Sequence, residues 1–142
     1  MNRACYRKLH RYKYQLMQDY EIETGLGGYS IETDYIALPP SGRMTIRQAY
    51  AWDGPSGPTI DTLTLMRGSL VHDALYQLLR LEALPSKEKA FADKLLRTIC
   101  LEDGMNHLFA RIVYLGVKWF GGSSSRPGTE RPDMIICVPV DN

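Results

Sequence analysis

The sequence has few cysteines and no long run of apolar residues. Its three cysteines, Cys5, Cys100 and Cys137, lie far apart among 142 residues and form no CxxC or CxxH pair. This spacing argues against a disulfide framework and a zinc knuckle. No segment approaches the roughly 18 apolar residues of a membrane-spanning helix, and the N-terminus lacks the apolar stretch of a signal peptide. We therefore expect synthesis in the cytoplasm and no transmembrane segment.

The sequence also lacks an excess of charge of either sign. Seventeen Lys and Arg residues balance sixteen Asp and Glu residues, for a net charge of +1. A net charge this small produces no strong electrostatic field that would attract nucleic acid, so no specific nucleic-acid partner is expected. The first thirteen residues are nevertheless basic. Two interpretations fit: an arm that contacts phosphates or anionic lipid headgroups, or a solvated terminus whose aromatic residues dock on the core.

The first third of the chain has the pattern of strands. Over residues 1–52, aromatic and β-branched residues alternate with polar ones, and glycine and proline turns interrupt them. In "RMTIRQAYAW", residues 43–52, apolar side chains recur at even spacing, which is the period of one half-buried strand. This part is predicted to form a small antiparallel sheet. Residues 53–67, rich in glycine and proline, are predicted to form a loop.

From residue 68 to residue 121 the apolar period is that of helices. The segment "LPS" separates the first two helices and offers Ser86 as an N-cap, with Glu88 in the following turn. Because this connection is short, the two helices should form an antiparallel hairpin. A third amphipathic helix is predicted through Leu108, Ile112, Val113, Leu115 and Trp119, ending at Gly121 and Gly122.

The end of the chain has less regular signals. Residues 122–133, "GSSSRPGTERPD", are predicted to form a flexible linker, and residues 134–142 a C-terminal strand or tail. Together these patterns predict a single α+β domain over residues 1–142. In it, a small N-terminal antiparallel β-sheet packs on a three-helix core.

The segment "LVHDALY" places three polar side chains on the first helix. Tyr76 follows His72 by one turn and shares its face, whereas Asp73 lies about 100° round the helix. Asp73 is therefore badly placed to pair with His72. On the second helix, Asp93 falls near the apolar face, where a carboxylate needs a partner. We predict that Asp93 orients His72, as in a pair of general base and orienting carboxylate.

Asp73 is then left for another role. The preceding loop "AWDGPSGP" is rich in glycine and proline, and its carbonyl groups cannot all be bonded internally. With Asp53 and Asp73 as carboxylates, these oxygens would suit a hard cation such as Ca²⁺. Water activated by His72 could then attack a carbonyl group polarised by the metal. The structural alternative is a buried His–Asp pair that crosslinks two helices, beside two consecutive turns.

Three motifs in this order, "AWDGPSGP", "LVHDALY" and "ADKLL", resemble a phage and bacterial family known as domain of unknown function 1353, over about residues 30–121. More distantly, they are similar to bacterial and fungal secreted phospholipase A₂, including its antiparallel helical hairpin. The resemblance implies His72 as the base, Asp93 as its orienting carboxylate, Tyr76 as the helix tyrosine beside them, and Asp73 with the carbonyls of Trp52, Asp53 and Gly54 as calcium ligands.

This resemblance implies a phage-type, calcium-dependent hydrolase of a phospholipid or another ester, carried in a virion or released at lysis. One departure is Pro55, which stands where the bacterial enzymes have a disulfide cysteine. The alternative is therefore a non-catalytic phage structural or accessory protein that keeps the scaffold and contacts virion proteins through its tyrosine-rich first third. A nucleotide phosphohydrolase and a zinc peptidase are disfavoured, because both need more clustered ligands.

Overall fold

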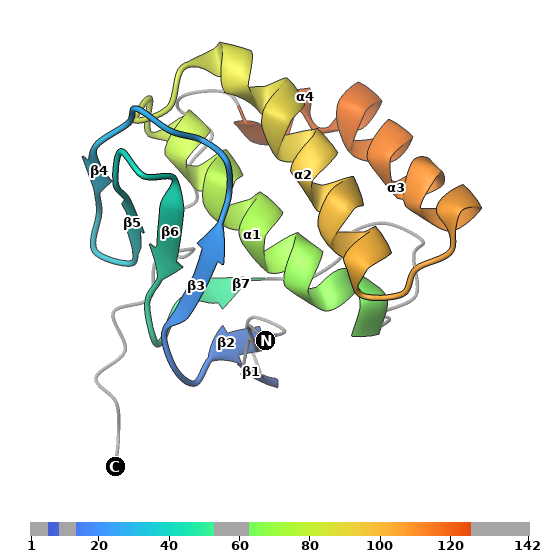
Figure 1. Ribbon diagram of the computed structural model, residues 1–142, viewed down its shortest axis with the longest axis horizontal. Coiled ribbons are helices and arrows are strands. Elements are labelled where there is room, and N and C mark those ends of the chain that lie inside the picture. Colours follow the sequence, from blue (N-terminus) through green and yellow to red (C-terminus); the bar gives the residue numbers. More distant parts are fainter. Residues whose placement is uncertain (1–5, 9–13, 53–62, 126–142) are drawn as a thin grey trace. The chain divides into compact units, whose positions relative to one another are not determined.

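The computed structural model describes residues 6–8, 14–52 and 63–125. Contacts divide the chain into two compact units, residues 1–53 with 131–142, and residues 54–130. Strands make up the first unit and helices the second, so the α+β class is confirmed (Figure 1). The prediction of a single domain stays a prediction.

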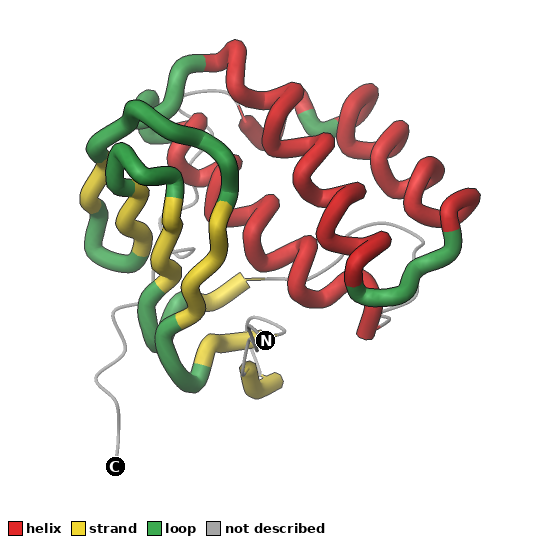
Figure 2. The backbone as a smooth tube through the Cα atoms, viewed as in Figure 1, coloured by secondary structure: helices red, strands yellow, loops and turns green. Residues whose placement is uncertain are grey.

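The described residues of the first unit form two small antiparallel sheets, where the sequence predicted one (Figure 2). The first sheet has the order β1-β2-β7 and the second the order β3-β6-β5-β4. The strands are β1 (Tyr6–Lys8), β2 (Tyr14–Leu16), β3 (Tyr20–Glu23), β4 (Ile31–Glu32), β5 (Ile36–Leu38), β6 (Arg43–Ile46) and β7 (Ala51–Trp52).

The chain passes from one sheet to the other within the segment predicted as one strand, residues 43–52. Between β6 and β7, Ala49 has a φ of 77°, a conformation that non-glycine residues seldom adopt. The side-chain amide of Gln15 donates to the Ala49 carbonyl at 3.0 Å and holds this turn. The even spacing of apolar residues therefore predicted their burial correctly, but the prediction of a continuous strand was wrong.

The helical unit consists of α1 (Leu63–Arg80), the 3-10 turn η1 (Ser86–Glu88), α2 (Lys89–Glu102), α3 (His107–Phe120) and the short α4 (Gly122–Ser125). Helix α2 contacts both α1 and α3 (Figure 1). Residues 63–67 of the predicted loop and 122–125 of the predicted linker are thus helical. The rest of both segments, and the predicted C-terminal strand, lie outside the described residues.

The first turns of α1, which the sequence predicted as loop, are held by long-range contacts. The Arg67 guanidinium donates to Asp103 at 2.9 Å and to Glu102 at 2.8 Å, at the end of α2. These charge-assisted bonds tie the first turns of α1 to the end of its antiparallel neighbour. The sequence did not reveal them, because the partners lie 35 and 36 residues apart.

The connection between α1 and α2 forms the predicted hairpin, but Ser86 is not an N-cap. Pro85 precedes η1, and the Glu88 amide bonds to the Pro85 carbonyl at 3.0 Å. Helix α2 then begins after Glu88, with no side-chain cap. Further along the hairpin, Gly68 allows α1 to approach α2 closely, because a Cβ there would lie 2.9 Å from a Leu96 methyl group. Cys100 packs in this interface, where burial raises the pKa of its thiol to about 12.

Helix α3 begins at the N-cap Asn106, whose side chain accepts from the Phe109 amide, and it ends before Gly121 as predicted. Of the five apolar residues that indicated this helix, Val113 alone is buried. Ala110 and Val113 enter the core, whereas Leu108, Ile112 and Trp119 are 71%, 53% and 66% exposed. Helix α3 is apolar on two sides, and the sequence period alone did not reveal which side faces α2.

Candidate functional site

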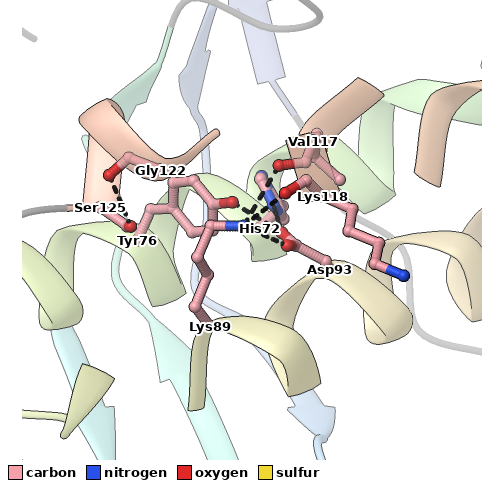
Figure 3. Close-up of polar contacts among 8 residues, drawn as sticks. All are labelled: His72, Tyr76, Lys89, Asp93, Val117, Lys118, Gly122 and Ser125. Atoms are coloured by element: carbon pink, nitrogen blue, oxygen red, sulfur yellow. Dashed lines mark hydrogen bonds and ion pairs between the residues drawn. The ribbon is translucent and has the colours of Figure 1, made fainter. Parts of the chain in front are cut away.

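The structure brings together three of the predicted site residues in the helical unit. His72 Nε2 lies 2.8 Å from Asp93 Oδ1, and the Tyr76 hydroxyl donates to the same oxygen at 2.6 Å (Figure 3). All three side chains are buried, and Asp93 is only 1% exposed. The predicted pairing of His72 with Asp93 is therefore present, while their catalytic roles stay predictions.

Helical geometry explains how these side chains meet. His72 and Tyr76 are one turn apart on α1, so they present their rings to the same side, with centroids 4.0 Å apart. Asp93 lies one turn into α2, which packs against α1. A carboxylate at this position would be costly to bury alone, and the two donors from α1 compensate its loss of water.

A fourth residue, Lys89, belongs to this site and was missed in the sequence. Its Nζ donates to Asp93 Oδ2 at 2.7 Å and to the Val117 carbonyl at 3.2 Å, near the end of α3 (Figure 3). A positive charge is favourable at the C-terminal end of a helix. The spacing of four residues between Lys89 and Asp93 was a usable signal. The contact with α3 was not, because a backbone carbonyl has no sequence signature.

The protonation states of the pair follow from burial and hydrogen bonding. Burial alone would raise the pKa of Asp93, but hydrogen bonds from His72, Lys89 and Tyr76 hold it below its ordinary value of 3.8. An ionised carboxylate only accepts hydrogen bonds, so His72 Nε2 must carry the proton. Burial lowers the pKa of His72 below 6.5, and this effect exceeds the opposing influence of Asp93. The ring is therefore neutral at pH 7, with its lone pair on Nδ1.

Tyr76 stays a hydrogen-bond donor over the physiological pH range. Burial raises the pKa of its hydroxyl, and so do the hydrogen bond to Asp93 and the charges of Asp93 and Asp73. Asp73 is a half-buried residue of α1 whose charge raises the pKa of Tyr76. Asp73 thus lies beside the network of His72, Tyr76, Asp93 and Lys89.

The predicted calcium ligands are only partly described. Asp53 and Gly54 lie outside the described residues, and Trp52 is the last residue of β7, where its buried ring packs 5.5 Å from that of Tyr14. Within residues 6–8, 14–52 and 63–125, no group of three or more His, Cys, Asp or Glu side chains is placed to hold a metal. Calcium also accepts backbone oxygens. The calcium site, with Asp73 as one carboxylate ligand, stays a prediction.

Gly121, interpreted from the sequence as a helix stop, also makes room for Tyr76. A Cβ at Gly121 would lie 2.4 Å from the Tyr76 hydroxyl oxygen and 2.5 Å from the Val117 carbonyl oxygen. No side chain fits at these distances without displacing the hydroxyl or the end of α3. The residue after α3 is thus coupled sterically to the hydrogen bond between Tyr76 and Asp93.

Gly121→Ala is therefore expected to lower the free energy of unfolding by about 1–3 kcal/mol, because the added methyl group overpacks the site. Urea denaturation at pH 7 measures this loss. Gly116→Ala is the matched control, since nothing lies within 4 Å of a Cβ there and alanine favours the helix by up to about 1 kcal/mol. Equal stability of the two variants would contradict the contact with Tyr76.

The lowered pKa of His72 also predicts how stability changes with pH. Below pH 6.5 the unfolded chain gains a proton at His72 that the folded chain does not, so acidification favours unfolding. Asp93 acts in the same direction below about pH 3.8. Between pH 7 and 5, the free energy of unfolding should fall more steeply for the wild type than for His72→Gln, by up to about 1.4 kcal/mol per pH unit. Identical slopes of unfolding free energy against pH for the wild type and His72→Gln would show that His72 is not desolvated. The control is His107→Gln, at an exposed histidine.

Comparisons with protein-family models, curated proteins and solved structures returned no significant match. The resemblance to domain of unknown function 1353 and to phospholipase A₂ therefore stays a prediction. Among the described helices, none combines the length and apolar character required to cross a bilayer.

Proposed function

We propose that this chain is a hydrolase that cleaves a lipid-like ester, with His72 as the water-activating base and calcium as its cofactor. One observation supports the proposal above the others. Asp93 accepts hydrogen bonds from His72, Tyr76 and Lys89, so the imidazole is held neutral with Nε2 protonated and Nδ1 available as a base. The lipid-like substrate and calcium come from the sequence resemblance.

In the proposed reaction, His72 Nδ1 takes a proton from water while the water oxygen bonds to the ester carbonyl carbon. The resulting tetrahedral intermediate collapses when the ester C–O bond breaks. The imidazolium then returns its proton to the departing alkoxide oxygen, which yields a carboxylic acid and an alcohol. Asp93 stabilises the imidazolium through the bond at Nε2. Calcium, when bound, would supply positive charge that polarises the carbonyl group.

Lys89 and Tyr76 have positioning roles in this proposal. Both hold Asp93, one at each carboxylate oxygen, so the carboxylate cannot rotate away from His72. Lys89 also neutralises the Asp93 charge while the imidazole is uncharged. The pair therefore does not depend on a protonated histidine for its stability, and His72 can stay a free base before substrate binds.

The test is calcium titration by calorimetry, followed by assay of fatty acid release from mixed phospholipid micelles. We expect the wild type to bind calcium with a Kd of roughly 10⁻⁴ to 10⁻³ M, as sites with few carboxylates do. Asp73→Asn should weaken binding at least about tenfold, because it removes a charged ligand oxygen. Asp34→Asn, at an exposed aspartate of the strand unit, is the control. Absence of both binding and turnover at millimolar calcium would overturn the proposal.

A second candidate is a non-catalytic structural or accessory protein, and one observation favours it. The same network is buried and joins α1, α2 and the end of α3, which is what a helix crosslink requires. This candidate predicts a folded protein whose stability depends on the network and which shows neither calcium binding nor ester hydrolysis. The calcium and micelle experiments therefore separate the two functions.

A further inference from the structure

Helix α3 has an apolar stripe on the side away from the core of its own unit. Leu108, Ile112 and Trp119 are exposed by 71%, 53% and 66%. Their spacings of four and seven residues place them on one line along the helix. Phe120, at the end of the helix, is 80% exposed. Exposed apolar side chains are common singly, but three on one line of a helix, with Phe120 about 100° round from the last of them, indicate an interaction surface.

Positive charge lies along one flank of this stripe. At about 100° per residue, the exposed Arg111 and Lys118 fall on the same side of the line through Leu108 and Trp119. Lys118 Nζ lies 5.9 Å from the centre of the Tyr114 ring, and the Arg97 guanidinium of α2 lies equally near it. Helix α3 contains no aspartate or glutamate. The flank is therefore basic along the length of the helix.

The apolar stripe and its basic flank fit a membrane surface better than a second copy of this chain. A helix with Leu, Ile, Trp and Phe on one side and Arg and Lys beside them is typical of helices that lie in a membrane interface. A second copy of this chain, docked about a two-fold axis with the two α3 helices antiparallel, would bring the two basic flanks together. A surface of anionic phosphates instead pairs with the basic residues, at roughly 1 kcal/mol for each basic residue near the surface.

We propose that α3 is a lipid-docking helix. It lies on an anionic membrane surface, with Leu108, Ile112 and Trp119 among the headgroups and upper acyl chains, and with Arg111 and Lys118 against lipid phosphates. The side chains of this surface lie outside the network around Asp93, which Lys118 meets only through its backbone carbonyl, an acceptor for Lys89. The proposal therefore does not depend on hydrolysis, and a non-catalytic protein could dock in the same way.

The test uses vesicles of equal parts phosphatidylglycerol and phosphatidylcholine, with phosphatidylcholine vesicles as the neutral comparison. Trp119 is the exposed one of the two tryptophans, since Trp52 is 1% exposed. We expect a blue shift of tryptophan emission and co-sedimentation with the anionic vesicles, and at least about tenfold weaker partition to the neutral ones. Trp119→Phe should abolish the emission shift while co-sedimentation persists.

Two double variants separate the apolar and the charged contributions. Ile112→Ser with Trp119→Ser removes apolar area that the membrane would bury. Arg111→Glu with Lys118→Glu reverses the charge of the basic flank. Each pair should weaken partition at least about tenfold. Leu81→Ser, at an apolar residue 43% exposed just after α1, is the matched control and should bind as the wild type does. Circular dichroism verifies that every variant stays folded.

Three results would overturn the proposal. The first is vesicle binding by both double variants equal to that of the wild type. The second is binding lost only in Arg7→Glu with Lys8→Glu, which would assign the contact to the basic N-terminus. The third is a dimer in sedimentation velocity that Ile112→Ser with Trp119→Ser dissociates, without any vesicle binding. Because none of these measurements detects ester cleavage, failure here leaves the proposed hydrolase function to its own test.

Discussion

Asp93→Ala is expected to lower the free energy of unfolding by about 3–5 kcal/mol, the usual loss when one partner of a buried charged network is removed. Asp93 is 1% exposed and accepts from three side chains. Without it, the buried donors of His72 and Tyr76 have lost their shared acceptor, and Lys89 has lost its counter-charge. Urea denaturation at pH 7 measures the change.

Asp93→Asn keeps the size of the side chain and one acceptor oxygen but removes its charge. Its free energy of unfolding should therefore lie between those of the wild type and of Asp93→Ala. Asp34→Asn, at an exposed position in the strand unit, controls for general effects of removing a carboxylate. A loss below about 1 kcal/mol for Asp93→Ala, no more than an average substitution causes, would mean that the network does not stabilise the helices.

His72→Gln should reduce kcat/KM for ester hydrolysis by about 10²–10⁴-fold, because a positioned general base contributes roughly this factor. Glutamine is chosen because its amide can still donate a hydrogen bond to Asp93 while offering no basic nitrogen. The variant should therefore keep most of the wild-type stability. Fatty acid release under saturating calcium measures activity, and urea denaturation measures stability.

The two measurements on His72→Gln separate catalysis from structure. A large loss of turnover in a stable protein assigns His72 to the chemistry. Turnover within about threefold of the wild type, well below the contribution of a general base, would exclude this role. His107→Gln is the matched control, since His107 is an exposed histidine at the start of α3.

The pairing at the candidate site could be predicted because two local rules determine it. The helical period places His72 and Tyr76 on one face, and the short connection after α1 brings α2 back beside it. A carboxylate at Asp93, surrounded by apolar residues, then needs a partner from α1. The contact of Lys89 with the Val117 carbonyl and the contact of Gly121 with the Tyr76 hydroxyl could not be predicted, because these partners lie on other helices. The pairing of Lys89 with Asp93 could have been predicted from their spacing of four residues.

Other parts of the fold were not predictable, because more than one arrangement satisfies the same pattern. Residues 43–52 have the period of a single strand, but the chain turns at Ala49 through a conformation that alanine rarely adopts. Helix α3 has two apolar sides, and only packing decides that Ala110 and Val113 face α2. The sequence pattern therefore could not show which side of α3 faces α2, and Leu108, Ile112 and Trp119 lie on the exposed side.

The central claim is that His72 is a neutral base whose Nε2–H is directed to Asp93. Nitrogen-15 NMR of the histidine rings through a pH titration tests it most directly, with His72→Gln assigning the His72 signals among the three histidines. We predict that at pH 7 the proton resides on Nε2, with Nδ1 unprotonated, and that the pKa of the ring lies below 6.5. A proton on Nδ1 at pH 7, or a pKa above 6.5, would contradict the account.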